Sequence, residues 1–139
     1  MQEVNFDEVV EQILNQDARY HRDAYMFLRE ALDFTQKLIS KENRGATRHV
    51  PGQELLDGLR QYALHEFGPM AKTVLEEWGV TQCRDFGNIV FNMVEIGLLA
   101  KTDKDSHDDF QNGYDFTAAF CKPFWPASRQ SEVAKPVAI

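Results

Sequence analysis

Hydrophobic residues between Pro51 and Thr102 recur at three- and four-residue intervals, and three glycines divide them into segments. This spacing puts hydrophobic side chains on one face of an α-helix. It predicts three consecutive helices, ended by Gly68-Pro69, Gly79 and Gly97, since glycine suits a helix C-terminus and proline the first turn of the next helix. Their apolar faces are Leu55, Leu56, Leu59, Tyr62 and Ala63; Met70, Ala71, Val74, Leu75 and Trp78; and Phe86, Ile89, Val90, Met93 and Val94.

The segment after Gly97 has a different pattern. Residues 98–102 form a short apolar run that is typical of a strand, and an acidic stretch follows. Asn112-Gly113 is a strong turn dipeptide, and residues 114–116 are expected to return as a second strand. Three helices followed by a hairpin are the plan of a winged helix, a relative of the helix-turn-helix.

Two further helices are predicted before Pro51. The first begins near Asn5, where Asn5 and Glu8 resemble a capping box. The second is the longest of the chain, at about Arg22 to Ser40, and its apolar band is wide, which predicts contacts on more than one side.

The expected fold is therefore mainly α with a small β-hairpin, and it has about five helices around a winged-helix-like core. We expect residues 1–50 to form a helical arm that packs on this core, and residues 51–120 to form the core itself. Residues 121–139, which contain three prolines, are expected to be an irregular tail. Within the tail, Phe124 and Trp125 are interpreted as a hydrophobic clip on the body or as a short motif for a partner.

Composition narrows the possible functions. The 139 residues carry a formal net charge of −7, which argues against a dedicated binder of nucleic acid or of an anionic membrane. No apolar run approaches the roughly 20 residues of a membrane span, and no secretion signal is recognised at the N-terminus. Cys83 and Cys121 are expected to be reduced thiols. These features predict a cytoplasmic protein without a membrane segment.

The loop at residues 41–49 is the one basic stretch. It is interpreted either as a solvated connector or as an anion- or partner-binding loop, through Lys41, Arg44, Arg48 and His49. Between residues 53 and 120, five basic residues stand against twelve acidic ones, which disfavours DNA recognition by the predicted third helix of the core.

No motif for catalysis, cofactor binding or metal binding is recognised. The four histidines lie at no metal-ligand spacing, and no phosphate-binding loop or nucleophile signature occurs. The acidic turn at residues 103–109 superficially resembles a calcium loop. Its sixth and twelfth positions are Asp108 and Tyr114 instead of glycine and glutamate, so it is interpreted as a solvated turn.

Four runs carry a resemblance to a known family: ARYHRDAYMFLREALDFTQK at 18–37, HVPGQELLDGLRQYALHEFGPMAKTVLEEWGV at 49–80, DFGNIVFNMVEIGLLAKT at 85–102 and DFQNGYDFTAAFCKPF at 109–124. Over residues 10–124 the chain resembles a family of small bacterial proteins of unknown function that is known by a "Minf"-type locus-tag name. The resemblance implies a bacterial cytoplasmic origin. It implies no activity and identifies no functional residue.

The leading functional prediction is a non-enzymatic module that contacts a protein partner, as a monomer or a homodimer. Its candidate contact residues are Tyr20, His21, Tyr25 and the basic loop. The first alternative is a nucleic-acid-associated accessory protein that uses the basic loop, which would gain support if Arg19, Arg22 and Arg29 shared its face. The second is a small enzyme, which requires a pocket with at least two convergent polar side chains.

Overall fold

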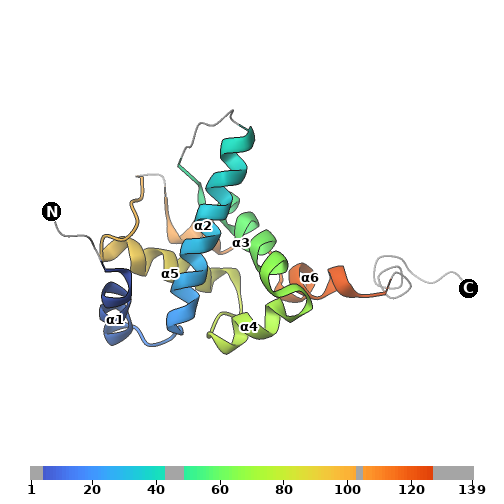
Figure 1. Ribbon diagram of the computed structural model, residues 1–139, viewed down its shortest axis with the longest axis horizontal. Helices are drawn as coiled ribbons and strands as arrows, with labels where there is room; N and C mark the ends of the chain where they lie inside the picture. Colours follow the sequence, from blue (N-terminus) through green and yellow to red (C-terminus); the bar gives the residue numbers. More distant parts are fainter. Residues whose placement is uncertain (1–4, 43–48, 103–104, 127–139) are drawn as a thin grey trace, which may run out of the picture.

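Helix α2 runs through the middle of the molecule, and α1, α3 and α5 pack against it (Figure 1). The computed structural model describes residues 5–42, 49–102 and 105–126. In chain order the α-helices are α1 (Phe6–Gln16), α2 (Arg22–Glu42), α3 (Gly52–Phe67), α4 (Ala71–Glu77), α5 (Cys83–Glu95) and α6 (Phe116–Phe120). Three 3-10 helices join them: η1 (Gly68–Met70), η2 (His107–Phe110) and η3 (Lys122–Phe124). The expectation of about five helices agrees with this architecture, in which α6 is a short segment of five residues.

The predicted β-hairpin is wrong, because the described residues contain no strand. The amides that would have begun the first strand instead complete the end of α5. Leu98 N–H donates to Met93 O at 2.8 Å and Gly97 N–H donates to Val94 O at 3.0 Å, while Gly97 has a φ of 88°. This is the Schellman arrangement, which satisfies the last carbonyls of a helix.

The predicted second strand, residues 114–116, lies between the short helical segments η2 and α6, and Phe116 already belongs to α6. Ser106 N–H donates to Asp109 Oδ2 at 3.0 Å, which caps η2, and Ala118 N–H donates to Asp115 Oδ2 at 3.0 Å, which caps α6. Side-chain caps of this kind favour a helical turn over an extended chain. The core is therefore not a winged helix with a hairpin wing, since helical turns occupy that part of the described chain.

One hydrophobic core lies between α2, α3 and α5, and residues from both sides of position 50 contribute to it. α2 packs most extensively against α3, and it also contacts α1 and α5. The crossing of α2 and α3 is very close at Gly58, where an added Cβ would lie 1.8 Å from Thr35 Oγ1. The absence of a side chain at Gly58 thus sets how near the two helices lie.

Phe116 and Phe120 of α6 are buried, whereas Phe124 of η3 is 46% exposed. The Lys122 ammonium lies 6.0 Å from the centroid of the half-buried Trp125 ring. The rest of the predicted tail lies outside the described residues. The division into an arm, a core and a tail at residues 50 and 120 stays a prediction.

Candidate functional site

A groove with aromatic walls lies where α2, α3 and the end of α4 meet. It encloses about 310 Å³ and is lined by Asp23, Met26, Phe27, Glu30, Tyr62, Glu66, Phe67 and Trp78. We call this surface the aromatic groove. Its lining includes three acidic side chains and no lysine or arginine.

The rings of the aromatic groove form one cluster centred on Phe27. The Phe27 centroid lies 5.5 Å from that of Tyr62, 5.8 Å from that of Phe67 and 5.6 Å from that of Trp78. Phe67 and Trp78 meet edge to face, at an interplanar angle of 78°. Aromatic pairs in this range stabilise one another beyond simple burial. Because Tyr62, Phe67 and Trp78 are only partly buried, the cluster presents ring surface to solvent.

An acidic side chain fixes the orientation of the Tyr62 ring. Its hydroxyl donates a hydrogen bond to Glu30 Oε2 at 2.9 Å. Burial raises the pKa of the Tyr62 hydroxyl above its ordinary value, and the neighbouring Glu30 and Glu66 raise it further. The phenol therefore stays neutral and keeps donating to Glu30. The carboxylates of Glu30 and Glu66 thus lie near the Tyr62 hydroxyl.

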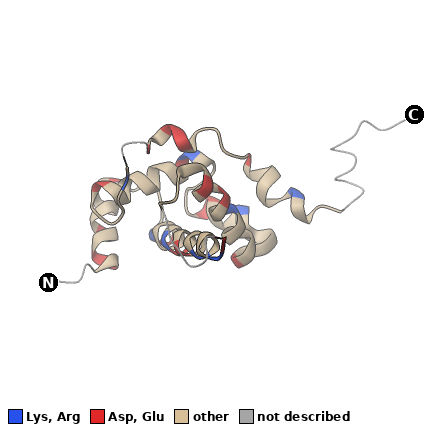
Figure 2. Ribbon diagram, turned by 90° about the horizontal axis from the view of Figure 1, so that it is seen from above, with Lys and Arg blue, Asp and Glu red and all other residues tan. Residues whose placement is uncertain are grey.

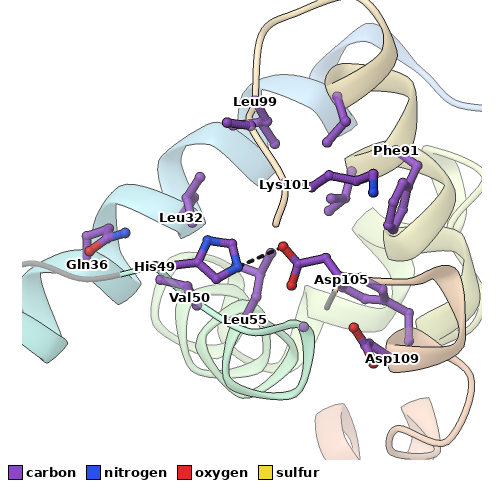
Figure 3. A pocket seen from close by; sticks show the side chains of 15 residues that line it. Leu32, Gln36, His49, Val50, Leu55, Phe91, Leu99, Lys101, Asp105 and Asp109 are labelled. Carbon is purple, nitrogen blue, oxygen red and sulfur yellow. Dashed lines mark ion pairs between the residues drawn. The ribbon is translucent and has the colours of Figure 1, made fainter. Parts of the chain in front are cut away.

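A second cavity, of about 220 Å³, lies between α2, α3, α5, the segments that lead into α3 and η2, and η2 itself (Figure 3). We call it the His49 pocket. Its walls are mostly apolar, and polar groups gather on one side of it, with His49, Lys101, Asp105 and Asp109 among them. The apolar residues that line it are Leu32, Val50, Leu55, Val90, Phe91, Val94, Leu99, Ala100 and Phe110.

The polar side of the His49 pocket is built on the Asp105 carboxylate. Asp105 Oδ2 lies 2.8 Å from His49 Nε2 and accepts hydrogen bonds from the Thr102 N–H at 2.8 Å and the Thr102 hydroxyl at 3.3 Å. Burial acts to raise the pKa of Asp105. The hydrogen bonds from Thr102 and His49 outweigh it, so the pKa lies below its ordinary value. An ionised carboxylate thus holds the imidazole in place beside the cavity.

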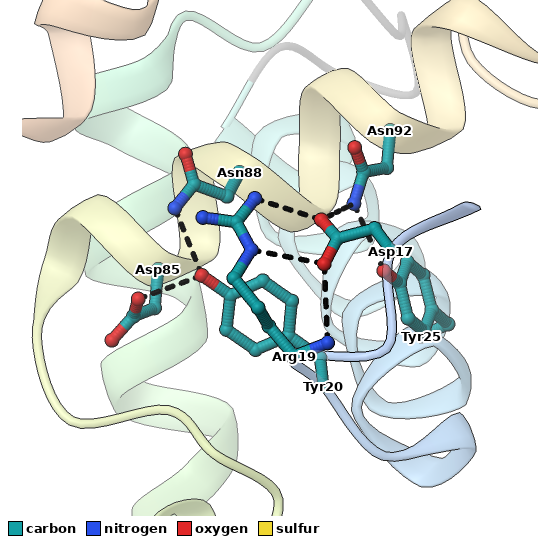
Figure 4. A network of polar contacts seen from close by, with 7 residues as sticks. All are labelled: Asp17, Arg19, Tyr20, Tyr25, Asp85, Asn88 and Asn92. Carbon is teal, nitrogen blue, oxygen red and sulfur yellow. Dashed lines mark hydrogen bonds and ion pairs between the residues drawn. The ribbon is translucent and has the colours of Figure 1, made fainter. Parts of the chain in front are cut away.

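The predicted contact residues Tyr20 and Tyr25 are buried, with exposed fractions of 3% and 0%, whereas His21 is exposed. Both hydroxyls belong to a polar network between the start of α2 and α5 (Figure 4). The Tyr20 hydroxyl donates to Asp85 Oδ1 at 2.7 Å, and Asn88 Nδ2 donates to the Tyr20 oxygen at 2.8 Å. Burial is the main cause that raises the Tyr20 pKa to about 12. The two rings therefore connect the start of α2 to α5. A partner could contact them only if these helices separated locally.

Asp17 is the acidic centre of the same network. Its carboxylate accepts two hydrogen bonds from the Arg19 guanidinium, at 2.9 and 2.7 Å, and one from Asn92 Nδ2 at 2.9 Å. Asn92 Nδ2 also donates to the Tyr25 hydroxyl at 3.0 Å. The bonds from Arg19 are the largest cause that holds the pKa of Asp17 well below its ordinary value.

We expect Asp17→Asn to lower the free energy of unfolding by about 1–2 kcal/mol at pH 7, because the bonds to Arg19 and Asn92 lose a charged acceptor at a partly exposed site. A carboxyl group whose pKa is lower in the folded than in the unfolded state stabilises the fold at pH values above its unfolded pKa, which is near 3.8 for aspartate. This stability is lost as the pH falls toward the folded value. The difference in the free energy of unfolding between wild type and Asp17→Asn should therefore be about 1 kcal/mol smaller at pH 3 than at pH 7. Denaturant unfolding at both pH values measures it.

The matched control for this experiment is Asp33→Asn, which removes an exposed carboxylate that pairs with Lys37 within α2 at 3.1 Å. An exposed pair of this kind contributes about 0.3–0.5 kcal/mol. A gap between wild type and Asp17→Asn that is the same at pH 7 and pH 3 would contradict the assigned role of Asp17.

The basic loop is only partly described. Lys41 is exposed at the end of α2, His49 is an exposed residue that lines the pocket, and Arg44 and Arg48 lie outside the described residues. Elsewhere in the described chain, basic and acidic segments are interspersed (Figure 2). Arg19 is paired with Asp17 and Arg22 with Glu11, while the Arg29 guanidinium lies 4.7 Å from the Phe6 ring centroid.

The acidic turn at 103–109 is also described only in part, since Asp103 and Lys104 lie outside the described residues. Two of its described carboxylates serve local structure: Asp105 binds Thr102 and His49, and Asp109 caps η2. Among the described residues, no cluster of three or more metal-binding side chains occurs.

The aromatic groove was not predicted from the sequence, because Tyr62 and Trp78 were interpreted only as members of apolar helix faces. A signal was present in α2, where Asp23, Phe27 and Glu30 recur at four- and three-residue spacing. Acids that share a helical face with an aromatic ring are unusual for a face that is only a core contact.

Comparison with known proteins identifies no relative: no family model, curated protein or solved structure matches the chain. In the part of the chain that the structure describes, no helix has the length and apolar character needed to cross a membrane.

Proposed function

We propose that the protein is a non-enzymatic interaction module, and that the aromatic groove binds a lysine- or arginine-bearing segment of a protein partner. One observation carries the proposal. A partly exposed ring cluster is bordered by Asp23, Glu30 and Glu66, with no basic side chain in its lining.

The chemistry of the groove favours a cationic side chain. Ring faces attract a cation through their quadrupole, most strongly for tryptophan, and arginine can also stack on a ring. The carboxylates add an opposite charge and hydrogen-bond acceptors for the same group. At about 310 Å³ the groove is at the small end of ligand pockets, which suits one or two inserted side chains.

The charge of the whole chain supports the same kind of partner. A net charge of −7 attracts a basic segment over long range and speeds its association. The nucleic-acid alternative has less support, since Arg19 and Arg22 are already paired with carboxylates. The enzyme alternative meets its requirement for convergent polar groups at the His49 pocket, although no serine, threonine or cysteine lines that pocket.

Selection of peptides from a random displayed library against the full chain tests the proposal. We expect the selected peptides to be enriched in arginine or lysine. The charge-removing variant Glu30→Gln/Glu66→Gln should raise their Kd about tenfold, because two carboxylates near the cation become neutral amides. Calorimetric titration of resynthesised peptides measures this change.

The matched control is Asp33→Asn/Glu95→Gln, which removes the same charge from exposed helix positions outside the groove lining. We expect its Kd to stay within about twofold of wild type, because distant exposed charges are screened by salt. Peptides that bind equally well after each arginine or lysine is replaced by norleucine would exclude the proposal.

A further inference from the structure

We propose that the His49 pocket binds a small apolar monocarboxylic acid, with the hydrocarbon part between α2, α3 and α5 and the carboxylate next to Lys101. This site is separate from the aromatic groove, with which it shares no lining residue. The proposal therefore stands or fails independently of the proposed function.

The walls of the pocket favour a hydrocarbon group. Three helices contribute apolar side chains to the lining, among them Leu32 of α2, Leu55 of α3 and Val90 of α5. The segment after α5 adds Leu99, and η2 adds Phe110. Each methylene that leaves water for such a site contributes to binding through the hydrophobic effect. A cavity with these walls has little to offer a wholly polar ligand.

The volume of the pocket limits the ligand to a small molecule. Its size of about 220 Å³ lies below the range of sites for drug-sized ligands. A water molecule occupies about 30 Å³ in the liquid, so the cavity corresponds to a ligand of roughly seven or eight heavy atoms. Hexanoate, which has eight heavy atoms, is a suitable probe.

The polar side of the pocket favours a negative head group. Asp105 already accepts hydrogen bonds from Thr102 and His49, and Asp109 accepts one from Ser106. Lys101, an exposed residue, is the only lysine or arginine in the lining, and Figure 3 marks no ion pair between it and another lining residue. A ligand carboxylate gains a charged partner at Lys101, whereas a ligand ammonium would meet carboxylates that are already bonded.

The experiment compares three probes with the same six-carbon chain: hexanoate, hexan-1-ol and hexylamine. Each is titrated into the full chain, with the methyl groups of leucine and valine followed by NMR. We expect hexanoate to bind about two- to fivefold more tightly than hexan-1-ol, as an exposed charge pair allows, and hexylamine to bind most weakly. The methyl shifts should be confined to the pocket: Leu32, Val50, Leu55, Val90, Val94 and Leu99.

Two substitutions test the proposal: one tests the contact of the carboxylate with Lys101, and the other tests the apolar cavity. Lys101→Met keeps an unbranched side chain that is one heavy atom shorter and removes its charge, so hexanoate should lose its advantage over hexan-1-ol. Lys37→Met is the control, since Lys37 lies outside the pocket lining and is paired with Asp33. Val94→Phe should fill the cavity and weaken all three probes, while thermal unfolding verifies that the variant is folded.

Results of three kinds would overturn the proposal. The first is that none of the probes binds the folded wild-type protein. The second is that hexylamine binds as tightly as hexanoate, or that Lys101→Met leaves the preference for hexanoate unchanged. The third is that the methyl shifts occur away from the pocket, which would remain decisive even if Val94→Phe failed to fold.

Discussion

Replacing Phe120 by alanine is expected to lower the free energy of unfolding by about 3–5 kcal/mol. The Phe120 side chain is fully buried, and its ring meets Phe116 edge to face at 5.0 Å and Tyr114 edge to face at 5.8 Å. Helix α6, which carries it, packs against α3 and α4. The substitution removes both ring contacts and leaves a cavity, since the surrounding helices relax only in part. Equilibrium unfolding in denaturant measures the loss.

Phe124→Ala is the matched control, because it makes the same chemical change four residues later at a position that is 46% exposed. We expect it to change the free energy of unfolding by about 0.5 kcal/mol or less, as is usual for a surface position. A loss below about 1 kcal/mol for Phe120→Ala would contradict the placement of α6 as part of the core.

Gly58→Ala is expected to lower the free energy of unfolding by about 2–3 kcal/mol, although alanine favours a helix over glycine by about 1 kcal/mol. The new Cβ would lie 1.8 Å from Thr35 Oγ1 and 2.9 Å from Thr35 Cβ. Neither helix can accept that overlap without moving away from the other. Overpacking of this kind strains side chains and shifts the backbone.

The partner variant Thr35→Ala identifies the cause of this loss. It removes the hydroxyl and methyl groups that the new Cβ would meet, so Gly58→Ala/Thr35→Ala should be more stable than the sum of the two single changes predicts. Additive losses, or a Gly58→Ala variant as stable as wild type, would show that α2 and α3 do not cross closely at this position.

The sequence predicted the helices well, because their ends depend on local chemistry. Gly79 and Gly97 both have positive φ values, 87° and 88°, and both end their helices with Schellman bonds. A glycine after an apolar run of helical period is therefore a reliable stop signal. The long helix predicted at about residues 22–40 is observed as Arg22–Glu42.

The prediction of a hairpin was wrong because a short apolar run is too short to show a helical or a strand periodicity. The run at 98–102 fits a strand or a buried segment equally well, and length alone does not separate them. Contacts with distant helices made the difference: the Phe116 ring, which begins α6, packs against Phe86 of α5, and the Tyr114 hydroxyl donates to Leu56 O of α3 at 2.7 Å. Local turn signals at Asn112-Gly113 did not outweigh these tertiary contacts.

The two candidate sites could not be predicted from the sequence for a related reason. His49 was a candidate as a member of a basic loop, yet the structure pairs it with Asp105, 56 positions later in the chain. Phe27 and Trp78 were expected to be ordinary apolar residues, yet they meet at 5.6 Å in the aromatic groove. Each site depends on which helices lie next to one another, and no local sequence pattern determines the distance between residues on different helices.

The sequence by itself determined the helices, their stop signals and the acidic charge of this protein. Helix propensity and glycine conformation act locally along the chain, and the net charge is a sum over its residues. The tertiary structure alone decided that η2 and α6 form where the hairpin was expected, that Tyr20 and Tyr25 are buried, and that the two sites exist at all. These outcomes depend on packing between distant segments, such as the close crossing at Gly58, where the free energy of a contact belongs to both helices together.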